Sequence, residues 1–199
     1  MERIIFATTN KGKLDEIKMI MKDFDVEIVS MKDAGIYAVI EETGTTFEEN
    51  AVIKAENIMK LTGCITLADD SGLEIDYINK EPGVYSARYL GEDTPYSVKN
   101  KVLIDRLSGA EGDERSARFV CAIAAAFPDG ETVVKRATIE GVIGYEERGT
   151  NGFGYDPILY VPEYGKTTGE MEPEEKNKIS HRGKALEMMK EVLRERLVK

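Results

Sequence analysis

The pattern of apolar and polar residues predicts a chain in which strands and helices alternate. Short β-rich runs predict strands, and apolar residues spaced three and four apart predict helices with one buried face. The predicted strands lie at residues 3–7, 26–30, 64–68, 73–78, 118–127 and 131–143, and the predicted helices lie at about 13–21, 46–61, 96–107 and 183–198. Alternation of this kind indicates an α/β fold.

Two local signals sharpen this prediction. Thr46 precedes Glu49 at the spacing of a capping box, which marks the start of the second helix. In that helix Asn50 and Lys54 share a face. The turn at residues 128–130, Pro-Asp-Gly, separates two β-rich runs and predicts a long antiparallel hairpin. If the chain has two lobes, we expect this hairpin to divide them.

Composition predicts a globular protein of one domain, residues 1–199, because 42% of the 199 residues are hydrophobic. The longest apolar run, residues 119–127, is far shorter than the roughly 20 residues of a membrane helix. We see no targeting segment either, so we expect no membrane association and a cytoplasmic location. Cys64 and Cys121 lack metal-site spacing, and we expect both to be buried, reduced thiols.

Net charge limits the partners of the protein. The formal net charge is −10 at pH 7, which repels a polyanionic backbone at long range. We therefore expect no nucleic-acid partner. A small anion together with a bound cation is compatible with this charge.

The stretch ATTNKGK, residues 7–13, connects the first predicted strand to the first predicted helix. It is not a P-loop, because Gly12 and Lys13 are followed by Leu14 rather than by Ser or Thr. A helix start nevertheless leaves N–H groups without partners, and Lys11 and Lys13 add positive charge. The stretch predicts either a phosphate-binding turn or an ordinary solvated turn.

The stretch LADDSGLEID places Asp69, Asp70 and Ser71 at the end of a predicted strand, where α/β sheets often bind ligands. Successive strand residues point to opposite faces, so we expect at most one of the two aspartates to enter a site. The alternative is a local Asp-Ser-Gly turn. Glu41 and Glu42 form a second acidic pair that either supplies a further carboxylate for a hard cation or is solvated surface.

Two later stretches also contain candidate ligand-binding residues. GTNGFGYDPI combines glycines with Phe153, Tyr155 and Asp156, which suits stacking of a flat base or a tight loop that caps the core. EEKNKISHRGKA places five basic residues just before a helix, in an otherwise acidic chain, and a bound anion there would offset the unfavourable helix dipole. These are Lys176, Lys178, His181, Arg182 and Lys184.

Together, these motifs resemble the inosine triphosphate pyrophosphatase family, the dITP/XTP diphosphatases. The resemblance rests on six stretches in the same order over nearly the whole chain: ATTNKGK, EETGTTFEENAVIKA, LADDSGLEID, PGVYSARY, GTNGFGYDPI and ISHRGKA. It implies an α/β fold of two lobes around a long mixed sheet with flanking helices and a central substrate cleft. It also implies a homodimer and Mg²⁺-dependent hydrolysis of purine nucleoside triphosphates to monophosphate and pyrophosphate.

The resemblance also implies a role for individual residues. Asp70 is the general base and, with Glu41, a metal ligand. Lys54 and Lys176 contact the triphosphate, Ser71 contacts the nucleotide, and Phe153 stacks on the base. The triphosphate is further bound by Thr8, Thr9, Asn10, Lys11, Gly12 and Lys13, the nucleotide by Gly154, Tyr155 and Asp156, and the 6-keto edge of the base by His181 and Arg182. Thr9 and Lys11 fall where the family pattern varies.

Three alternatives remain. The chain is a pyrophosphatase for other modified nucleotides, a nucleotide sensor without turnover, or a structural interaction protein. Intact Asp70 and Glu41 argue against the sensor, because a pure binder gains little from carboxylates that face phosphates. A structural role leaves the basic cluster unexplained.

Overall fold

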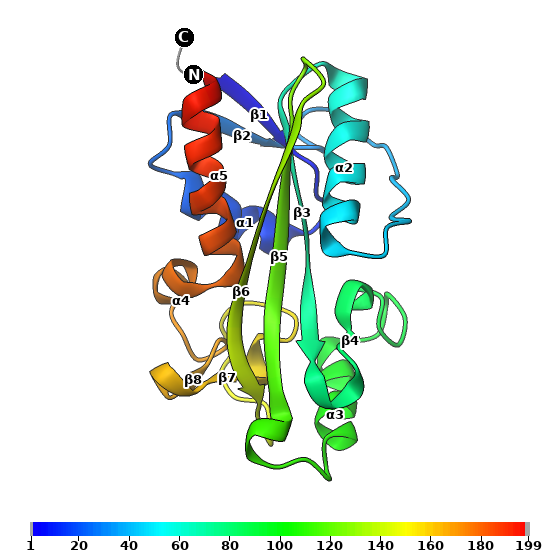
Figure 1. The fold of residues 1–199 in the computed structure, drawn as a ribbon, viewed down its shortest axis with the longest axis vertical. Coiled ribbons are helices and arrows are strands. Elements are labelled where there is room, and N and C mark those ends of the chain that lie inside the picture. The colour runs from blue at the N-terminus through cyan, green and yellow to red at the C-terminus, as the bar shows by residue number, and fades with distance from the viewer. Residues whose placement is uncertain (1, 198–199) are drawn as a thin grey trace. The chain divides into compact units, whose positions relative to one another are not determined.

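The computed structural model describes residues 2–197, in which strands and helices alternate as the sequence predicts (Figure 1). The strands are β1 (Glu2–Phe6), β2 (Val26–Ser30), β3 (Thr66–Ile75), β4 (Glu81–Pro82), β5 (Ser116–Ala126), β6 (Thr132–Ile143), β7 (Leu159–Val161) and β8 (Lys166–Thr167). The helices are α1 (Lys11–Met21), α2 (Phe47–Thr62), α3 (Tyr96–Arg106), α4 (Pro173–Ile179) and α5 (His181–Leu197). Val198, the predicted last residue of the final helix, lies outside the described residues.

The strands form one mixed sheet in the order β2-β1-β3-β5-β6-β7-β8, with β4 paired to β3. β1 is parallel to both β2 and β3, whereas β7 is antiparallel to β6 and β8. β5 and β6 are neighbours joined by the predicted turn, where Gly130 N donates to Phe127 O. The predicted α/β fold with a long mixed sheet and flanking helices is confirmed.

The described chain divides into two compact units. The first unit comprises the residues up to Asp70, Cys121–Ala137 and the residues from His181 onward. The second comprises Ser71–Val120 and Thr138–Ser180. Each unit is described by itself below, and the substrate cleft between lobes stays a prediction.

In the first unit, α1 and α5 cover one face of the strands, and α2 lies on the opposite side of β3 (Figure 1). α1 and α5 bury apolar side chains against the alternate residues of the strands that point toward them. This core contains Ile4, Phe6, Ile17, Leu67, Ile123, Leu186 and Met189, among others. In the second unit, Leu103 of α3 and Leu107, the C-cap of that helix, pack in a core with Leu73, Phe119 and Ile158.

One strand differs from the prediction. The sequence predicts two strands, 64–68 and 73–78, separated by a polar turn, whereas β3 is a single strand of 10 residues, Thr66–Ile75. Asp69 and Asp70 therefore lie inside the strand, not at its end. An Asp-Asp-Ser-Gly sequence favours a turn when taken alone, but here both carboxylates are buried beside cationic side chains, and this tertiary contact overrides the local preference.

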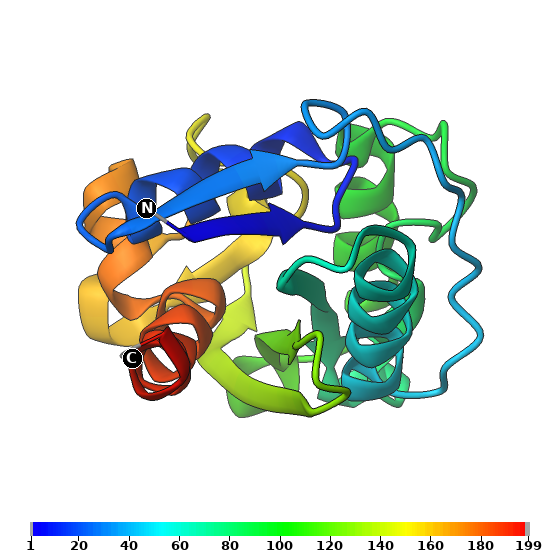
Figure 2. The same ribbon diagram turned by 90° about the horizontal axis from the view of Figure 1, so that it is seen from above.

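Smaller differences occur at element ends and in the connections. α1 begins at Lys11, two residues before the prediction, because Asn10 is its N-cap. The predicted loop 80–94 contains β4 and a short 3₁₀ turn. The stretch between β2 and α2, which includes Glu41 and Glu42, has no regular secondary structure beyond Gly35 and runs past α2 as a coil (Figure 2).

The remaining bulk predictions have mixed outcomes. Cys121 is buried, and burial raises the pKa of its thiol to about 12, so it is unreactive. Cys64 is also a free thiol, but it is only half-buried, which corrects the prediction for that residue. Within residues 2–197 there is no helix of the length and apolarity that crossing a membrane requires.

Candidate active site

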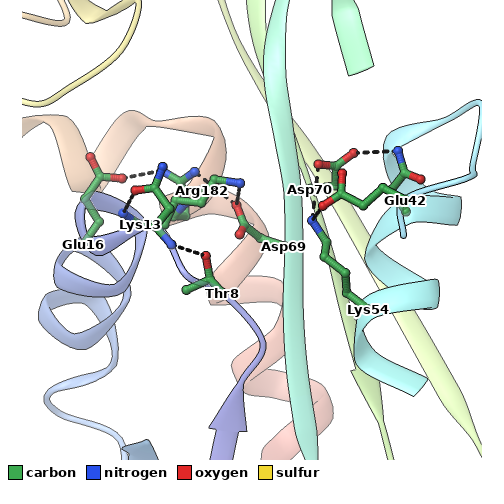
Figure 3. A network of polar contacts seen from close by, with 10 residues as sticks. Thr8, Lys13, Glu16, Glu42, Lys54, Asp69, Asp70 and Arg182 are labelled. Carbon is green, nitrogen blue, oxygen red and sulfur yellow. Dashed lines mark hydrogen bonds and ion pairs between the residues drawn. The ribbon is translucent and has the colours of Figure 1, made fainter. Parts of the chain in front are cut away.

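Asp69 and Asp70 project to opposite faces of β3, as alternation along a strand requires (Figure 3). Asp69 points toward α1 and α5, and Asp70 points toward α2 (Figure 3). Both are buried, with 1% and 6% of their surfaces exposed, respectively. The prediction that the two side chains point to opposite faces is confirmed, and each must be considered with its own partners. That at most one of them enters a site stays a prediction.

Asp69 lies between two cations. Its Oδ2 is 3.2 Å from Lys13 Nζ and 3.1 Å from Arg182 Nη2. Arg182, also buried, makes a second ion pair with Glu16 of α1. Burial alone would raise the pKa of Asp69, but Lys13 and Arg182 outweigh it and hold that pKa well below the usual range. Asp69 is thus ionised and joins the start of α1 to the start of α5.

Asp70 has a different environment on the other face. Its Oδ2 accepts a hydrogen bond of 3.2 Å from Asn50 Nδ2, and its Oδ1 is 3.4 Å from Lys54 Nζ. Burial raises the pKa of Asp70 despite the neighbouring lysine, and the Glu42 carboxylate adds to the increase. A carboxyl with a raised pKa beside a cation suits general-base chemistry.

Helix α2 positions the partners of Asp70. Thr46 and Glu49 form the predicted capping box at its start, with Glu49 N donating to Thr46 Oγ1 over 3.1 Å. Asn50 and Lys54, one turn apart, then face β3. Gly44 N donates to Asn50 Oδ1 over 2.8 Å, which turns the amide so that its Nδ2 points to Asp70. A Cβ at Gly44 would lie 2.6 Å from that Oδ1, so this approach requires glycine.

Lys54 connects two carboxylates. Its Nζ lies 2.8 Å from Glu42 Oε1 as well as 3.4 Å from Asp70 Oδ1. Burial would lower the pKa of Lys54, but the surrounding carboxylates, Asp70 first, raise it. The structure thus places Glu42 beside Asp70, while Glu41 is exposed. Glu41 as a metal ligand stays a prediction.

The predicted phosphate-binding turn is a capped helix start. Asn10 Oδ1 accepts from Lys13 N over 3.1 Å, and Thr8 Oγ1 accepts from Asn10 N over 3.1 Å. Thr9 and Lys11 are exposed. The first N–H groups of a helix have no intrahelical partner, so those of Lys11 and Gly12 are available to an anion.

A second group of predicted residues lies in the second unit. Asp156 Oδ2 accepts from Phe153 N over 2.8 Å and is 2.7 Å from Lys176 Nζ. The ammonium of Lys176 also lies 5.3 Å from the centre of the Phe153 ring. Asp156 and Lys176 are buried, so the cation and the carboxylate satisfy each other. Ser71, also in this unit, lies half-buried on β3 directly after Asp70.

Tyr155 and Gly154 are held by hydrogen bonds within this unit. Tyr155 is 5% exposed, and its hydroxyl donates to Ser86 O over 2.6 Å. Gly154 O accepts from Asn100 Nδ2 at 3.4 Å. Direct contact of the Tyr155 side chain with a nucleotide stays a prediction. His181 is buried at the first position of α5, next to Arg182 in the first unit.

Some residues of these groups were missed in the sequence. Glu16 has a usable signal, because it follows Lys13 by three residues on one face of α1. Glu42 was noted only as part of an acidic pair. Asn100 has no local signal, because its partners lie 47 and 54 residues away in the chain.

Comparison with known proteins places the chain in a family. A sequence model of the Ham1 family matches residues 4–192. The chain belongs to the Ham1 family. Its curated relatives include the dITP/XTP pyrophosphatase of Bacillus licheniformis, 49% identical over 97% of this chain and 98% of that protein. That of Clostridium perfringens is 47% identical over 98% of each chain.

Solved Ham1 structures have the same fold. The Ham1 protein of Staphylococcus aureus matches with a TM-score of 0.88 and 39% identity, covering 98% of this chain and 100% of that one. The Ham1 protein of Coxiella burnetii matches with a TM-score of 0.88, 42% identity and the same coverage. The family resemblance found in the six motifs is therefore confirmed.

Proposed function

We propose that this protein hydrolyses non-standard purine nucleoside triphosphates, ITP, dITP and XTP, to nucleoside monophosphate and pyrophosphate, and so removes them from the nucleotide pool. The proposal draws on the names of its Ham1 relatives. The observation that carries it is Asp70, a buried carboxyl with a raised pKa between the Asn50 amide and the Lys54 ammonium. Such a group is suited to accept a proton from water.

In the proposed reaction, a water oxygen attacks the α-phosphorus in line. The bond between the α-phosphorus and the α,β-bridging oxygen breaks, pyrophosphate leaves, and Asp70 takes the proton of the water. Lys13, Lys54 and Lys176 stabilise negative charge on the phosphates, so that catalysis is mainly positioning and charge neutralisation. No covalent enzyme intermediate is needed.

We also propose Mg²⁺ as the cofactor. Residues 2–197 contain no group of three or more His, Cys, Asp or Glu side chains arranged to hold a metal. Mg²⁺, however, is usually held by one or two carboxylates plus substrate phosphates. Asp70 and Glu42 fit this requirement, because both already face one cation, the Lys54 ammonium. Asp70, with a carboxylate of the pair Glu41 and Glu42, would hold the ion, which neutralises phosphate charge when bound.

Base selectivity is proposed to come from hydrogen-bond mismatch. Groups at His181 and Arg182 that donate to a 6-keto oxygen would meet a donor when adenine presents its 6-amino group. Unpaired buried polar groups make such rejection large, on the order of 10⁴-fold. Arg182 is held by Asp69 and Glu16, which fixes its direction. From the family resemblance we also propose a cytoplasmic homodimer.

The test is chromatography of the products formed from ITP, XTP, dITP, GTP and ATP, with Mg²⁺ or with a chelator. We expect monophosphate and pyrophosphate from ITP, XTP and dITP, little product from ATP, and none with chelator. Diphosphate with orthophosphate would place the attack at the γ-phosphorus and contradict the mechanism. In the same assay extended to many triphosphates, turnover of modified pyrimidine nucleotides would favour the broader pyrophosphatase, and binding without turnover would favour the sensor.

Two matched variants resolve the metal part of this test. Glu41→Gln and Glu42→Gln each remove one negative charge from neighbouring positions. The variant that loses the metal ligand is expected to need a higher Mg²⁺ concentration for half-maximal rate. Equal Mg²⁺ dependence of both variants and the wild-type protein would remove both residues from the proposed metal site.

A further inference from the structure

The loop that carries Phe153 has a conformationally permissive backbone. Gly152 and Gly154 flank Phe153 and both have positive φ angles, +72° and +65°. Glycine is the most permissive residue in backbone conformation, so this loop depends on contacts from elsewhere to hold the Phe153 ring in one direction.

Asp156 holds the backbone N–H of Phe153, on the N-terminal side of that residue. Its Oδ2 accepts from Phe153 N over 2.8 Å, and its Oδ1 accepts from Thr168 Oγ1 over 2.8 Å. A Cβ at Gly152 would lie 2.1 Å from Asp156 Oδ2. The carboxylate thus fixes the amide of Phe153, and Asp156 N donates to Phe153 O over 3.2 Å, but neither bond holds the carbonyl of Gly154.

On the C-terminal side, α3 supplies the contacts. Asn100 Nδ2 donates to Glu147 Oε1 over 2.6 Å, and the same nitrogen faces Gly154 O at 3.4 Å. The Tyr96 ring meets the Tyr155 ring edge-on, with centroids 5.0 Å apart. Glu147 therefore holds the Asn100 amide in the orientation in which it reaches the carbonyl that follows Phe153.

Stability alone gives a poor reason for an amide at this position. Asn100 is 1% exposed, and its Oδ1 has no hydrogen-bond partner within residues 2–197. A buried polar atom without a partner costs about 1–3 kcal/mol. An apolar side chain of similar size would avoid that cost, but it would leave Gly154 O without its donor.

We propose that Asn100 is a positioning residue that fixes Gly154 and thereby orients the Phe153 ring for stacking on the base. The inference rests on the proposed function, because that function gives Phe153 its base. It predicts that loss of the Asn100 amide loosens the loop and weakens binding of the base, while binding of the phosphates is unaffected.

The chain contains no tryptophan, so Phe153→Trp creates a single fluorescent reporter in the loop. In this background we expect Asn100→Ala to raise the acrylamide quenching constant at least twofold and to lower the fluorescence anisotropy. Asn57→Ala is the control, because Asn57 is exposed on α2 and its side chain donates to Ile53 O of its own helix. Quenching equal to that of the control would overturn the proposal.

A paired substitution separates orientation from general loss of packing. Asn100→Asp keeps the size of the side chain but places a carboxylate against Glu147, so we expect the reporter to be as mobile as in Asn100→Ala. Adding Glu147→Gln relieves the repulsion between the two carboxylates but gives Gly154 O no donor, so we expect the reporter to stay as mobile as in Asn100→Ala. Recovery of most of the lost protection would overturn the role of the amide bond to Gly154.

Binding measured by calorimetry gives a readout for function. In the protein with Phe153 intact, Asn100→Ala should weaken inosine monophosphate about tenfold and leave pyrophosphate unchanged. Equal weakening of both ligands, or of neither, would overturn the inference. Failure of the proposed function would give a different result, because the wild-type protein would then hydrolyse none of the triphosphates tested.

Discussion

Two neighbouring residues of the same type, Asp69 and Asp70, have opposite pKa shifts in this protein. The pKa of Asp69 is lowered because Lys13 and Arg182 both contact it, whereas burial dominates at Asp70 and raises its pKa. Divergent pKa values of adjacent carboxyls are typical of sites that need one fixed charge and one proton acceptor. Asp69 supplies the charge, and Asp70 is the candidate acceptor.

Asp70→Asn is expected to lower the hydrolysis rate at least a hundredfold while substrate binding largely persists. The folded protein is expected to be at least as stable as the wild type at pH 7. Because the pKa of Asp70 is higher in the folded than in the unfolded state, ionisation costs stability as pH rises through these pKa values, and an amide avoids the cost. Steady-state kinetics and urea unfolding at pH 7 measure both effects, and a near-wild-type rate would remove Asp70 as the base.

Asp69→Asn is expected to have the opposite effect on stability. It leaves the buried Arg182 and Lys13 without their shared carboxylate, a change that costs about 3–5 kcal/mol for buried ion pairs. The pKa of Asp69 is lowered on folding, so its contribution is present above the usual aspartate range and disappears only as pH falls far below it. Urea unfolding at pH 7 and pH 5 should give similar losses, and a loss below about 1 kcal/mol, the range of exposed pairs, would contradict this account.

Single elements explain how the side chains reach their positions. α2 begins at a capping box, and its first two turns place Asn50 and Lys54 beside Asp70. The bonds from Thr45 and Thr46 to Glu49 also lower the pKa of Glu49. The capping box at the start of α2 therefore helps to place Asn50 and Lys54 beside Asp70, the candidate base.

Thr46→Ala removes the side-chain oxygen of the N-cap and is expected to lower the free energy of unfolding by about 1 kcal/mol. Because Asn50 lies in the following turn, we also expect a lower kcat with little change in KM. Ser97→Ala, at an exposed position of α3, is the matched control for loss of a hydroxyl. A stability loss with an unchanged kcat would show that the cap supports the helix without positioning Asn50.

The helices and strands also show which features local sequence signals can predict. The capping box of α2 and the turn at residues 128–130 were predictable, because these signals involve residues three or four apart. β3 was predicted as two strands, since Asp-Asp-Ser-Gly favours a turn. Cations from α1, α2 and α5 stabilise the aspartates inside the strand, and nothing near residue 70 in the sequence indicates them.

At the scale of the whole molecule, the charge is strongly negative. The chain has 37 acidic and 27 basic residues, which gives the formal net charge of −10. Several basic residues of the predicted binding motifs are paired within their own units, Lys13 and Arg182 with Asp69 and Lys176 with Asp156. These carboxylates neutralise much of the positive charge of the motifs.

This distribution predicts very weak binding to nucleic acids. We expect a labelled DNA or RNA duplex to bind with a Kd above about 10⁻⁴ M at physiological salt, weaker than ordinary non-specific binding. Fluorescence anisotropy at 50 mM and 200 mM salt measures this. Micromolar affinity that falls steeply with salt would show a phosphate-binding surface that the net charge hides.

The sequence alone determined the α/β class, most element positions and, through its ordered motifs, the family, because periodicity, caps and motifs are written in neighbouring residues. It also determined that the Asp69 and Asp70 side chains point to opposite faces, since side chains alternate along a strand. Only the tertiary structure decided which aspartate has which pKa, that Glu42 pairs with Lys54, and that Asn100 contacts the Phe153 loop. Those properties depend on burial and on partners up to 113 residues away in the chain, and their distances are set by packing rather than by local preference.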